Sequence, residues 1–182
     1  YFLFVGRLDN AKGVLLLLHV FAKFCQQNKE YSLLVAGSGS DFFIKKCMNL
    51  ISNYCILDRV SFLGHRTDVY KLMEEAKALI VPSRHEGFGF ITTEAMYNHC
   101  LVIGKNTAGT KEQFDIGYEM IGKEIGFRFY TEQELFEKLC NVISLPQNRY
   151  TEITEAAYNV VQCNYTIKNH VKNIEAFYKR IK

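Results

Sequence analysis

Short apolar runs alternate with amphipathic stretches along most of this chain. The runs are typical of strands buried on both faces, and they cover residues 1–5, 31–36, 59–63, 78–81 and 100–103. Between them, apolar residues spaced three or four apart predict helices over residues 14–25, 40–54, 68–75 and 90–99. One face of the first helix carries Val14, Leu17, Leu18, Phe21 and Cys25.

The pattern weakens after Gly104, where one more short strand is expected within residues 117–129. From Thr131 onward the chain is expected to be helical, and the last helix has Val171, Ile174, Tyr178 and Ile181 in register. Because strands and helices alternate, the chain predicts repeated βαβ units. We therefore expect an α/β fold, a Rossmann-like doubly wound parallel sheet with a mostly helical tail over residues 131–182.

The composition is typical of one globular domain and does not indicate nucleic-acid binding or a membrane span. With 182 residues, 48% of them hydrophobic, the chain can bury the core of one domain. The net charge of +3, from 22 basic and 19 acidic residues, is too balanced to indicate nucleic-acid binding. It is compatible with an anionic small ligand or an anionic membrane surface. No apolar stretch in the sequence is long enough to cross a bilayer.

The cysteines and histidines show no ligand spacing. No C-x-x-C pair occurs, and each cysteine lies in or beside an apolar segment, which favours six buried, reduced thiols in a cytosolic protein. We therefore expect neither disulfides nor a metal site. The chain has no initiator Met and opens within a predicted strand, so we expect it to be a fragment whose N-terminal partner domain is missing. The cysteines are Cys25, Cys47, Cys55, Cys100, Cys140 and Cys163.

The most informative stretch runs from residue 78 to residue 96. An apolar strand ends at Pro82, a glycine-rich turn follows, and a helix begins near Phe90. Gly87 and Gly89 allow the backbone to come close to a ligand. The first N–H groups of the helix, at its positive dipole end, suit a phosphate.

Two glutamates bracket this turn. Glu94 lies about one turn into the helix and leans back toward its start, so Glu86 and Glu94 can face the same ligand. Carboxylates repel a phosphate, but they accept hydrogen bonds from the vicinal hydroxyls of a ribose or hexose. The combination indicates a nucleotide-sugar. The spacing of the two glutamates alone is more typical of a solvated turn beside a capped helix.

Other candidates follow the first and third predicted strands. Arg7 and Lys12 can together neutralise a diphosphate, although loop cations are more often simply solvated. His65 and Arg66 lie where a nucleotide base could be read. The segment Gly37-Ser38-Gly39 is half of a dinucleotide fingerprint, and its commoner role is a tight turn.

Four motifs, in order, resemble the C-terminal, donor-binding domain of the GT-B glycosyltransferases of family 4. The resemblance covers residues 1–115 strongly and the helical tail loosely, and it implies one half of a GT-B fold. The last of the four is the family's E-x7-E motif. The motifs are Gly6-Arg7-Leu8 with Lys12-Gly13, Val35-Ala36-Gly37-Ser38-Gly39, Val60-Ser61-Phe62-Leu63-Gly64, and Glu86-Gly87-Phe88-Gly89 through Glu94-Ala95-Met96.

The resemblance also implies a role for each matching residue. Arg7 and Lys12 would hold the diphosphate, and Glu94 would bind the ribose. Glu86 is the catalytic candidate and would contact the donor sugar. The backbone of Gly87, Phe88 and Gly89 would help to hold that sugar, and the amides of Phe90 and Ile91 would face the phosphates.

The activity implied by this resemblance is a retaining, metal-independent sugar transfer without a cofactor. The donor would be a UDP-, GDP- or ADP-linked sugar and the acceptor a glycan or a lipid-linked sugar, in the cytoplasm or at the inner face of the cell membrane. The chain departs from the family over residues 107–112, where relatives often carry paired glycines before an acidic residue. Two alternatives remain: a GT-B nucleotide-sugar epimerase, and a non-catalytic module that binds a nucleotide-sugar.

Overall fold

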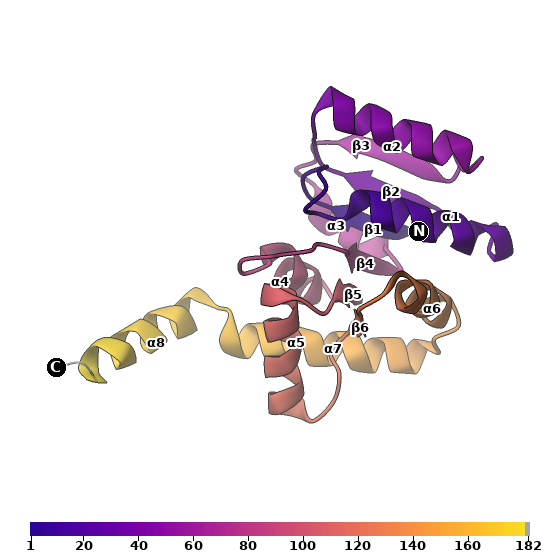
Figure 1. Ribbon diagram of the computed structural model, residues 1–182. Helices are drawn as coiled ribbons and strands as arrows, with labels where there is room; N and C mark the ends of the chain where they lie inside the picture. The colour runs from indigo at the N-terminus through magenta and orange to yellow at the C-terminus, as the bar shows by residue number, and fades with distance from the viewer. Residues whose placement is uncertain (181–182) are drawn as a thin grey trace.

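Six short strands form one parallel sheet at the centre of the computed structural model, which describes residues 1–180 (Figure 1). Their order is β3-β2-β1-β4-β5-β6, so the connections reverse direction between β1 and β4. Doubly wound sheets bind ligands at such a switch point. The strands are β1 (Phe2–Val5), β2 (Leu33–Ala36), β3 (Val60–Gly64), β4 (Ala78–Val81), β5 (Val102–Lys105) and β6 (Phe127–Phe129).

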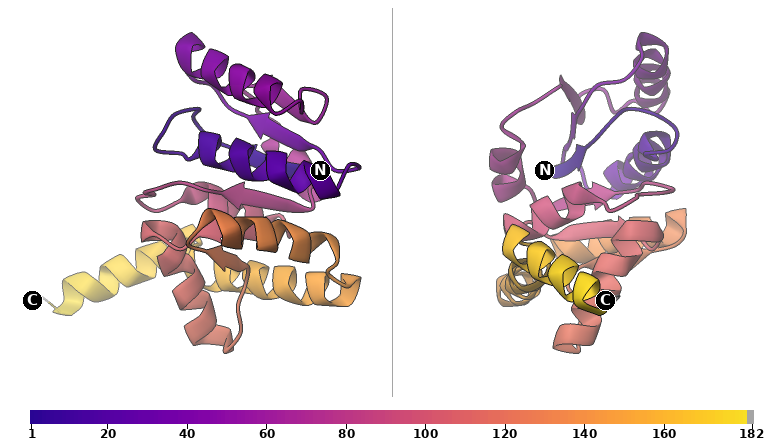
Figure 2. Two further views of the ribbon diagram at one scale, coloured as in Figure 1. Left: turned by 45° about the vertical axis from the view of Figure 1, so that its right-hand side comes forward. Right: turned by 90° about the vertical axis from the view of Figure 1, so that its left-hand side faces the viewer.

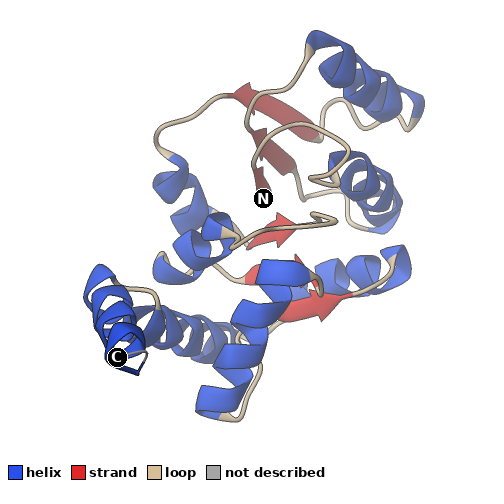
Figure 3. Ribbon diagram, turned by 60° about the vertical axis from the view of Figure 1, so that its left-hand side comes forward, coloured by secondary structure: helices blue, strands red, loops and turns tan. Residues whose placement is uncertain are grey.

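Helices cover both faces of this sheet (Figure 3), which confirms the Rossmann-like α/β fold. Side chains alternate along each strand, so Phe2 and Phe4 join the core under α1, α2 and α6, whereas Leu3 joins the core under α3, α4, α5 and α7. Burial on both faces explains the continuous apolar runs. The helices are α1 (Val14–Gln27), α2 (Asp41–Asn53), α3 (Val69–Glu75), α4 (Phe90–Tyr97), α5 (Ala108–Ile121), α6 (Glu132–Ile143), α7 (Gln147–Asn164) and α8 (Ile167–Arg180).

The prediction was wrong between residues 100 and 121. The strand begins two residues later than expected, and Gly104 lies within β5 rather than beyond its end. A Cβ on Gly104 would lie 2.6 Å from Thr110 Cγ2, so the glycine lets α5 pack directly on the strand. The helix α5 was not predicted, because Gly109 and Gly117 interrupt its pattern.

The helical tail is confirmed, but most of it belongs to the body of the domain. The helix α6 packs on α1, and α7 packs on α4 and α5. The last helix, α8, extends from the end of α7 away from the sheet (Figure 2). Its residues Val171, Ile174 and Tyr178 are exposed, and Ile181 lies outside the described residues. Within residues 1–180, no helix combines the length and apolar character that a membrane span requires.

All six cysteines are free, but only three are buried. Burial raises the pKa of Cys25 and Cys47 to about 11, and that of Cys100 to about 12. Cys55 and Cys163 are exposed, so the expectation of six buried thiols is wrong. These two residues lie at the ends of helices, where an apolar neighbour in the sequence does not ensure burial.

Candidate functional site

The loops after β1 and β4 meet at the switch point of the sheet. The backbone N–H of Arg84 donates to the carbonyl of Ala11 at 2.8 Å. Gly13 has a φ of 72°, and a Cβ at this position would lie 2.2 Å from the carbonyl oxygen of Pro82. Only glycine permits so close an approach with this backbone conformation. The two loops that the sequence singled out are therefore in direct contact.

Glu86 is held between these loops. Lys12 Nζ lies 2.6 Å from Glu86 Oε1, and Ser83 Oγ donates to the same oxygen at 2.6 Å. Glu86 is only 8% exposed, so its carboxylate needs these two partners to offset the cost of its burial. The backbone N–H of Lys12 donates to Asp9 Oδ1 at 2.9 Å, which stabilises the turn that presents the lysine. The predicted diphosphate cation and the predicted sugar-binding carboxylate thus form an ion pair.

A cleft of about 280 Å³ lies at the carboxyl ends of β1, β2 and β3. Arg7 lines it from the loop after β1, and Ile91 and Glu94 line it from the first two turns of α4. His65 and Arg66 line it from the end of β3. Five predicted site residues therefore share one cleft. The remaining lining residues are Val5, Gly6, Ala36, Gly37, Ser38 and Val69.

The two arginines of this cleft differ in how firmly they are engaged. Arg66 donates from Nε and one terminal nitrogen to the two carboxylate oxygens of Asp68, at 2.8 and 2.6 Å. The hydrogen bond from Arg66 holds the pKa of Asp68 below its usual value. The side chain of Arg7 is 78% exposed and lies 3.4 Å from Asp9. Arg7 can therefore turn toward an anion at little cost, whereas Arg66 must first release its two hydrogen bonds to Asp68.

The turn from Gly87 to Phe90 is not part of the lining of this cleft, and it forms the start of α4. Gly89 precedes the helix with a φ of 79°, in the left-handed region that favours glycine. Among residues 1–180, no group accepts a hydrogen bond from the backbone N–H of Gly89 or Phe90. Unpaired N–H groups at the positive end of a helix attract anions.

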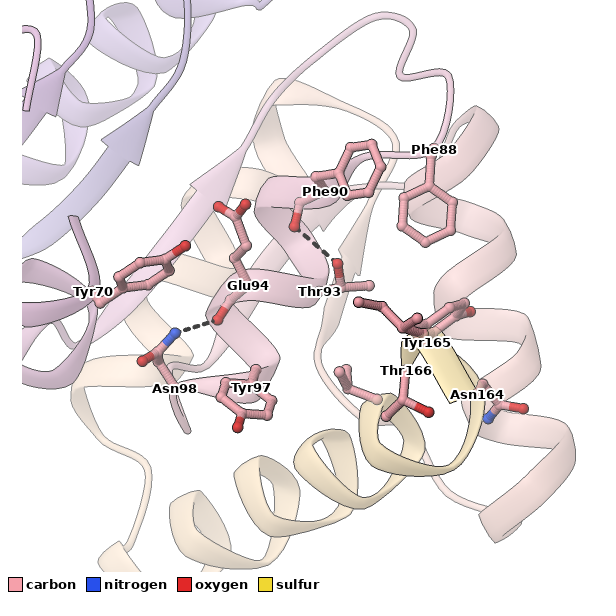
Figure 4. A pocket seen from close by; sticks show the side chains of 12 residues that line it. Tyr70, Phe88, Phe90, Thr93, Glu94, Tyr97, Asn98, Asn164, Tyr165 and Thr166 are labelled. Atoms are coloured by element: carbon pink, nitrogen blue, oxygen red, sulfur yellow. Dashed lines mark hydrogen bonds between the residues drawn. The ribbon is translucent and has the colours of Figure 1, made fainter. Parts of the chain in front are cut away.

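A second, larger hollow of about 880 Å³ lies between α3, α4 and the junction of α7 with α8 (Figure 4). Its wall is aromatic: the rings of Phe88 and Phe90 are 4.8 Å apart, and Phe88 meets Tyr165 edge-on at 5.4 Å. Glu94 lines both the hollow and the cleft, and its carboxylate points away from Tyr165 and Thr166 (Figure 4). No local pattern in the sequence predicts this hollow, because its far wall comes from residues about 70 positions beyond Glu94.

Residues 107–112, which depart from the family pattern, form hydrogen bonds with the turn that carries Glu86. Thr107 Oγ1 donates to the carbonyl of Ser83 at 3.2 Å, and the N–H of Gly109 donates to the carbonyl of Glu86 at 3.0 Å. Ala108, between them, has a φ of 45°, a conformation that glycine adopts more readily. The supporting roles of Ser83 and Thr107 were not predicted from the sequence, because the hydrogen bonds that they make form only in the folded chain. In the part of the chain that the structure describes, no three His, Cys, Asp or Glu side chains are grouped to hold a metal ion.

Comparison with known proteins agrees with this arrangement. Residues 1–160 match the family described as Glycosyl transferases group 1. The trehalose synthase of Pyrococcus horikoshii is 24% identical over an alignment of 176 positions, which covers 92% of this chain and 41% of that protein. This chain therefore spans less than half the length of that relative.

Two solved structures share the fold. The first is Anabaena HepE in complex with UDP, with a TM-score of 0.85 and 22% identity over 98% of this chain and 48% of that one. The second is the C-terminal domain of LpcC, a group 1 protein from Francisella tularensis, with a TM-score of 0.76 and 19% identity over 92% of this chain and 87% of that one. Because the family match extends over most of the sequence and the parallel sheet agrees with it, this chain belongs to the glycosyl transferases group 1 family.

Proposed function

We propose that this chain is the donor-binding half of a glycosyltransferase whose donor is a nucleotide-sugar. The observation that carries the proposal is the cleft at the switch point, which Arg7 and Glu94 line together near the Lys12–Glu86 pair. A cation, a carboxylate and a helix start at one sheet edge suit a ligand with both phosphates and hydroxyls. HepE is described in complex with UDP, which makes UDP the first nucleotide to test.

In this proposal Arg7 and Lys12 bind the diphosphate together with the backbone N–H groups of Phe90 and Ile91. Glu94 accepts hydrogen bonds from the ribose hydroxyls, because it lines the cleft and its carboxylate has no side-chain donor among the described residues (Figure 4). The base lies toward the end of β3, where His65 and Arg66 close the same cleft. In this proposal the ligand lies across the carboxyl ends of β1 to β3, as expected for a doubly wound sheet.

Glu86 contacts the donor sugar in this proposal, with the backbone of Gly87, Phe88 and Gly89. The diphosphate attracts Lys12, which weakens the hold of the lysine on Glu86 Oε1. The carboxylate then accepts a hydrogen bond from a sugar hydroxyl while Ser83 keeps its orientation. Binding of the donor is thus coupled to rearrangement of one ion pair.

Transfer in this proposal needs no metal, because two cations and a helix start can stabilise the departing diphosphate. Retention of the anomeric configuration belongs to the same proposal: the acceptor attacks the face of the sugar from which the diphosphate leaves. The acceptor is a glycan or a lipid-linked sugar at the cytoplasmic face of a membrane. It is bound mainly by the part of the polypeptide that this chain does not include, since the chain spans 41% of its trehalose synthase relative.

Calorimetric titration with UDP, GDP and ADP tests the donor site. Arg7→Ala and Glu94→Gln should each weaken binding of the preferred nucleotide by about 1–3 kcal/mol, the range for hydrogen bonds to charged groups. Lys45→Ala, an exposed lysine on α2, is the matched control and should bind as the wild type does. Unchanged affinity in both site variants would remove these residues from the site, and failure of the wild type to bind any of the three would refute the proposal.

A second experiment separates transfer from the other readings, using the whole polypeptide and a labelled donor. Transfer to an acceptor supports the proposal. A changed sugar with no acceptor present would indicate an epimerase instead, and binding without any turnover would indicate a non-catalytic module.

A further inference from the structure

Gln113 is a polar side chain enclosed beneath the turn that begins α4. It is 1% exposed, and its Nε2 donates to the carbonyls of Phe88 and Gly89, at 2.5 and 3.3 Å. One turn earlier on α5, the N–H of Gly109 donates to the carbonyl of Glu86 at 3.0 Å. A Cβ on Gly109 would lie 2.4 Å from the carbonyl oxygen of Phe88, so this helix face touches the turn directly.

These contacts determine which way the peptide groups of the turn point. In a trans peptide, the C=O and the N–H point in opposite directions, and the described residues include no cis peptide. The carbonyl of Phe88 shares its peptide group with the N–H of Gly89, and the carbonyl of Gly89 shares its group with the N–H of Phe90. Gln113 binds both carbonyls from the side of α5, and the N–H of Thr92 also donates to the carbonyl of Gly89, at 2.9 Å. Both N–H groups therefore face away from Gln113, and the peptide group between Phe88 and Gly89 has Gln113 as its side-chain partner.

The side that faces away from α5 is the side of the loop after β1. The helix α5 follows β5, and β5 lies across β4 from β1 in the sheet. Groups that point away from α5 therefore point toward the loop after β1, which carries Arg7 and Lys12. Figure 4 shows that the side chains of Phe88 and Phe90 lie over the aromatic hollow, so the backbone alone is left for this role.

Two buried polar atoms around Gly89 have no hydrogen-bond partner within residues 1–180. They are Thr110 Oγ1 and Gln113 Oε1, and both residues are 1% exposed. A Cβ on Gly89 would lie 3.6 Å from Gln113 Nε2 and 3.7 Å from Thr110 Oγ1. An unpaired buried polar atom destabilises a fold. Natural proteins keep unpaired buried polar atoms mainly where a functional site requires a particular geometry.

We propose that Gln113 is a positioning residue of the donor site. It does not touch the donor. It holds the N–H group of Phe90 toward the diphosphate and that of Gly89 toward the adjoining donor sugar. The need for such a residue follows from the sequence of the turn: Phe88 is flanked by two glycines, whose peptide groups rotate easily unless something holds them. This inference rests on the proposed function, because it assumes that a nucleoside diphosphate occupies the cleft.

The test compares a nucleotide with its nucleoside. UDP and uridine are titrated by calorimetry into the wild type and Gln113→Leu, which has a side chain of similar size and no N–H donor. We expect the dissociation constant of UDP to rise about tenfold, the effect of losing one charge-assisted contact, while that of uridine stays unchanged. If GDP or ADP binds more tightly than UDP, the matching nucleoside replaces uridine.

Thr154→Val is the matched control. Thr154 is also buried, at 3% exposed, and its hydroxyl donates to the carbonyls of Tyr150 and Thr151 in α7, not to the turn. It should lower the melting temperature and leave UDP binding unchanged. Gln113→Glu, which ionised can accept but not donate, serves as the second variant if Gln113→Leu does not fold, and it should weaken UDP binding in the same way.

The outcomes separate this inference from the proposed function. Unchanged UDP affinity in the Gln113 variant overturns the inference and leaves the proposed function intact. Equal weakening of UDP and uridine also overturns it, because a general loss of structure then explains the result. A wild type that binds none of the three nucleoside diphosphates refutes the proposed function, and the inference with it.

Discussion

Removing the charge of Lys12 tests whether the ion pair at the switch point joins the two donor loops. Lys12→Met keeps most of the aliphatic length and leaves Glu86, 8% exposed, with Ser83 as its remaining side-chain partner among the described residues. Two unit charges about 4 Å apart attract by about 4 kcal/mol at an effective dielectric constant of about 20. Desolvation of both groups offsets part of this attraction.

The partial exposure of the pair sets the expected loss. The side chains of Lys12 and Glu86 are 23% and 10% exposed, so the pair is less enclosed than a fully buried one. Removing one partner of a buried pair costs about 3–5 kcal/mol, so we expect Lys12→Met to lower the free energy of unfolding by about 2–3 kcal/mol. Most of that loss comes from the carboxylate left without its cation.

A double-mutant cycle isolates the interaction itself. Glu86→Gln removes the charge and keeps an acceptor for the Ser83 hydroxyl, and the double variant completes the cycle. We expect a coupling energy of about 1–2 kcal/mol from urea unfolding followed by circular dichroism. The exposed pair Lys123–Glu152, at 2.7 Å with side chains 65% and 38% exposed, is the control, and its coupling should be unmeasurable.

Equal coupling energies in the two cycles would show that the Lys12–Glu86 pair does not join the two loops. A coupling between Lys12 and Glu86 below about 0.3 kcal/mol would make the pair equivalent to an ordinary surface ion pair. The contact between the loops would then depend on Gly13 and on the Arg84 to Ala11 hydrogen bond alone.

Three further predictions concern the rest of the domain. Hydrogen bonds from Lys111 and Arg128 lower the pKa of Asp115, so this carboxylate stabilises the fold above its unfolded pKa, about 4, and ceases to do so as the pH falls through its lower folded pKa. Solvent screens this partly exposed carboxylate, so urea unfolding should show Asp115→Asn less stable than the wild type by only about 0.5 kcal/mol at pH 7. A difference in stability that persists at pH 2 would contradict this. Gly109→Ala should lower the melting temperature, because the added Cβ would lie 2.4 Å from the carbonyl oxygen of Phe88. Gly87→Ala is the control and should not lower it, because no atom lies within 4 Å of a Cβ there. Equal melting temperatures of the two variants would show that α5 can shift to make room. Maleimide labelling of the native protein at pH 7.5, followed by mass spectrometry, should modify the exposed thiols rapidly. The buried thiols, whose pKa is raised, should react only when the protein unfolds. Rapid labelling of all six cysteines would refute the assigned burial. The exposed thiols are Cys55 and Cys163, and the buried ones are Cys25, Cys47 and Cys100.

Features that depend on neighbouring residues in the sequence were predicted more accurately than features that depend on distant ones. The face of α1 with Val14, Leu17 and Phe21 is fully buried as predicted, because helical periodicity alone selects the residues that meet the sheet. The start of β5 was misplaced because Cys100 and Leu101 are as buried as the strand itself, at 1% exposed, although they belong to its connection. Burial and strand pairing are separate properties, and hydrophobicity reports the first.

The residues of the candidate site likewise include some that the sequence predicted and some that it did not. Arg7, Ile91 and Glu94 were placed together from the sequence, because loops and helix starts that follow parallel strands gather at one edge of a sheet. The amide of Gln113 was not assigned a role, since the carbonyls that it holds lie 24 and 25 positions away and nothing in its neighbours indicates them.

The sequence by itself determined the parallel sheet, the buried helix faces and the edge where the candidate residues gather, because each follows from short-range periodicity and from the properties of βαβ units. Only the tertiary structure decided that Lys12 pairs with Glu86, 74 positions away, and that α5 supports the turn that begins α4. Those contacts depend on strand order and on the close approach that Gly13 and Gly109 permit. Such approaches arise from distances between whole elements, and a local pattern of residues does not contain them.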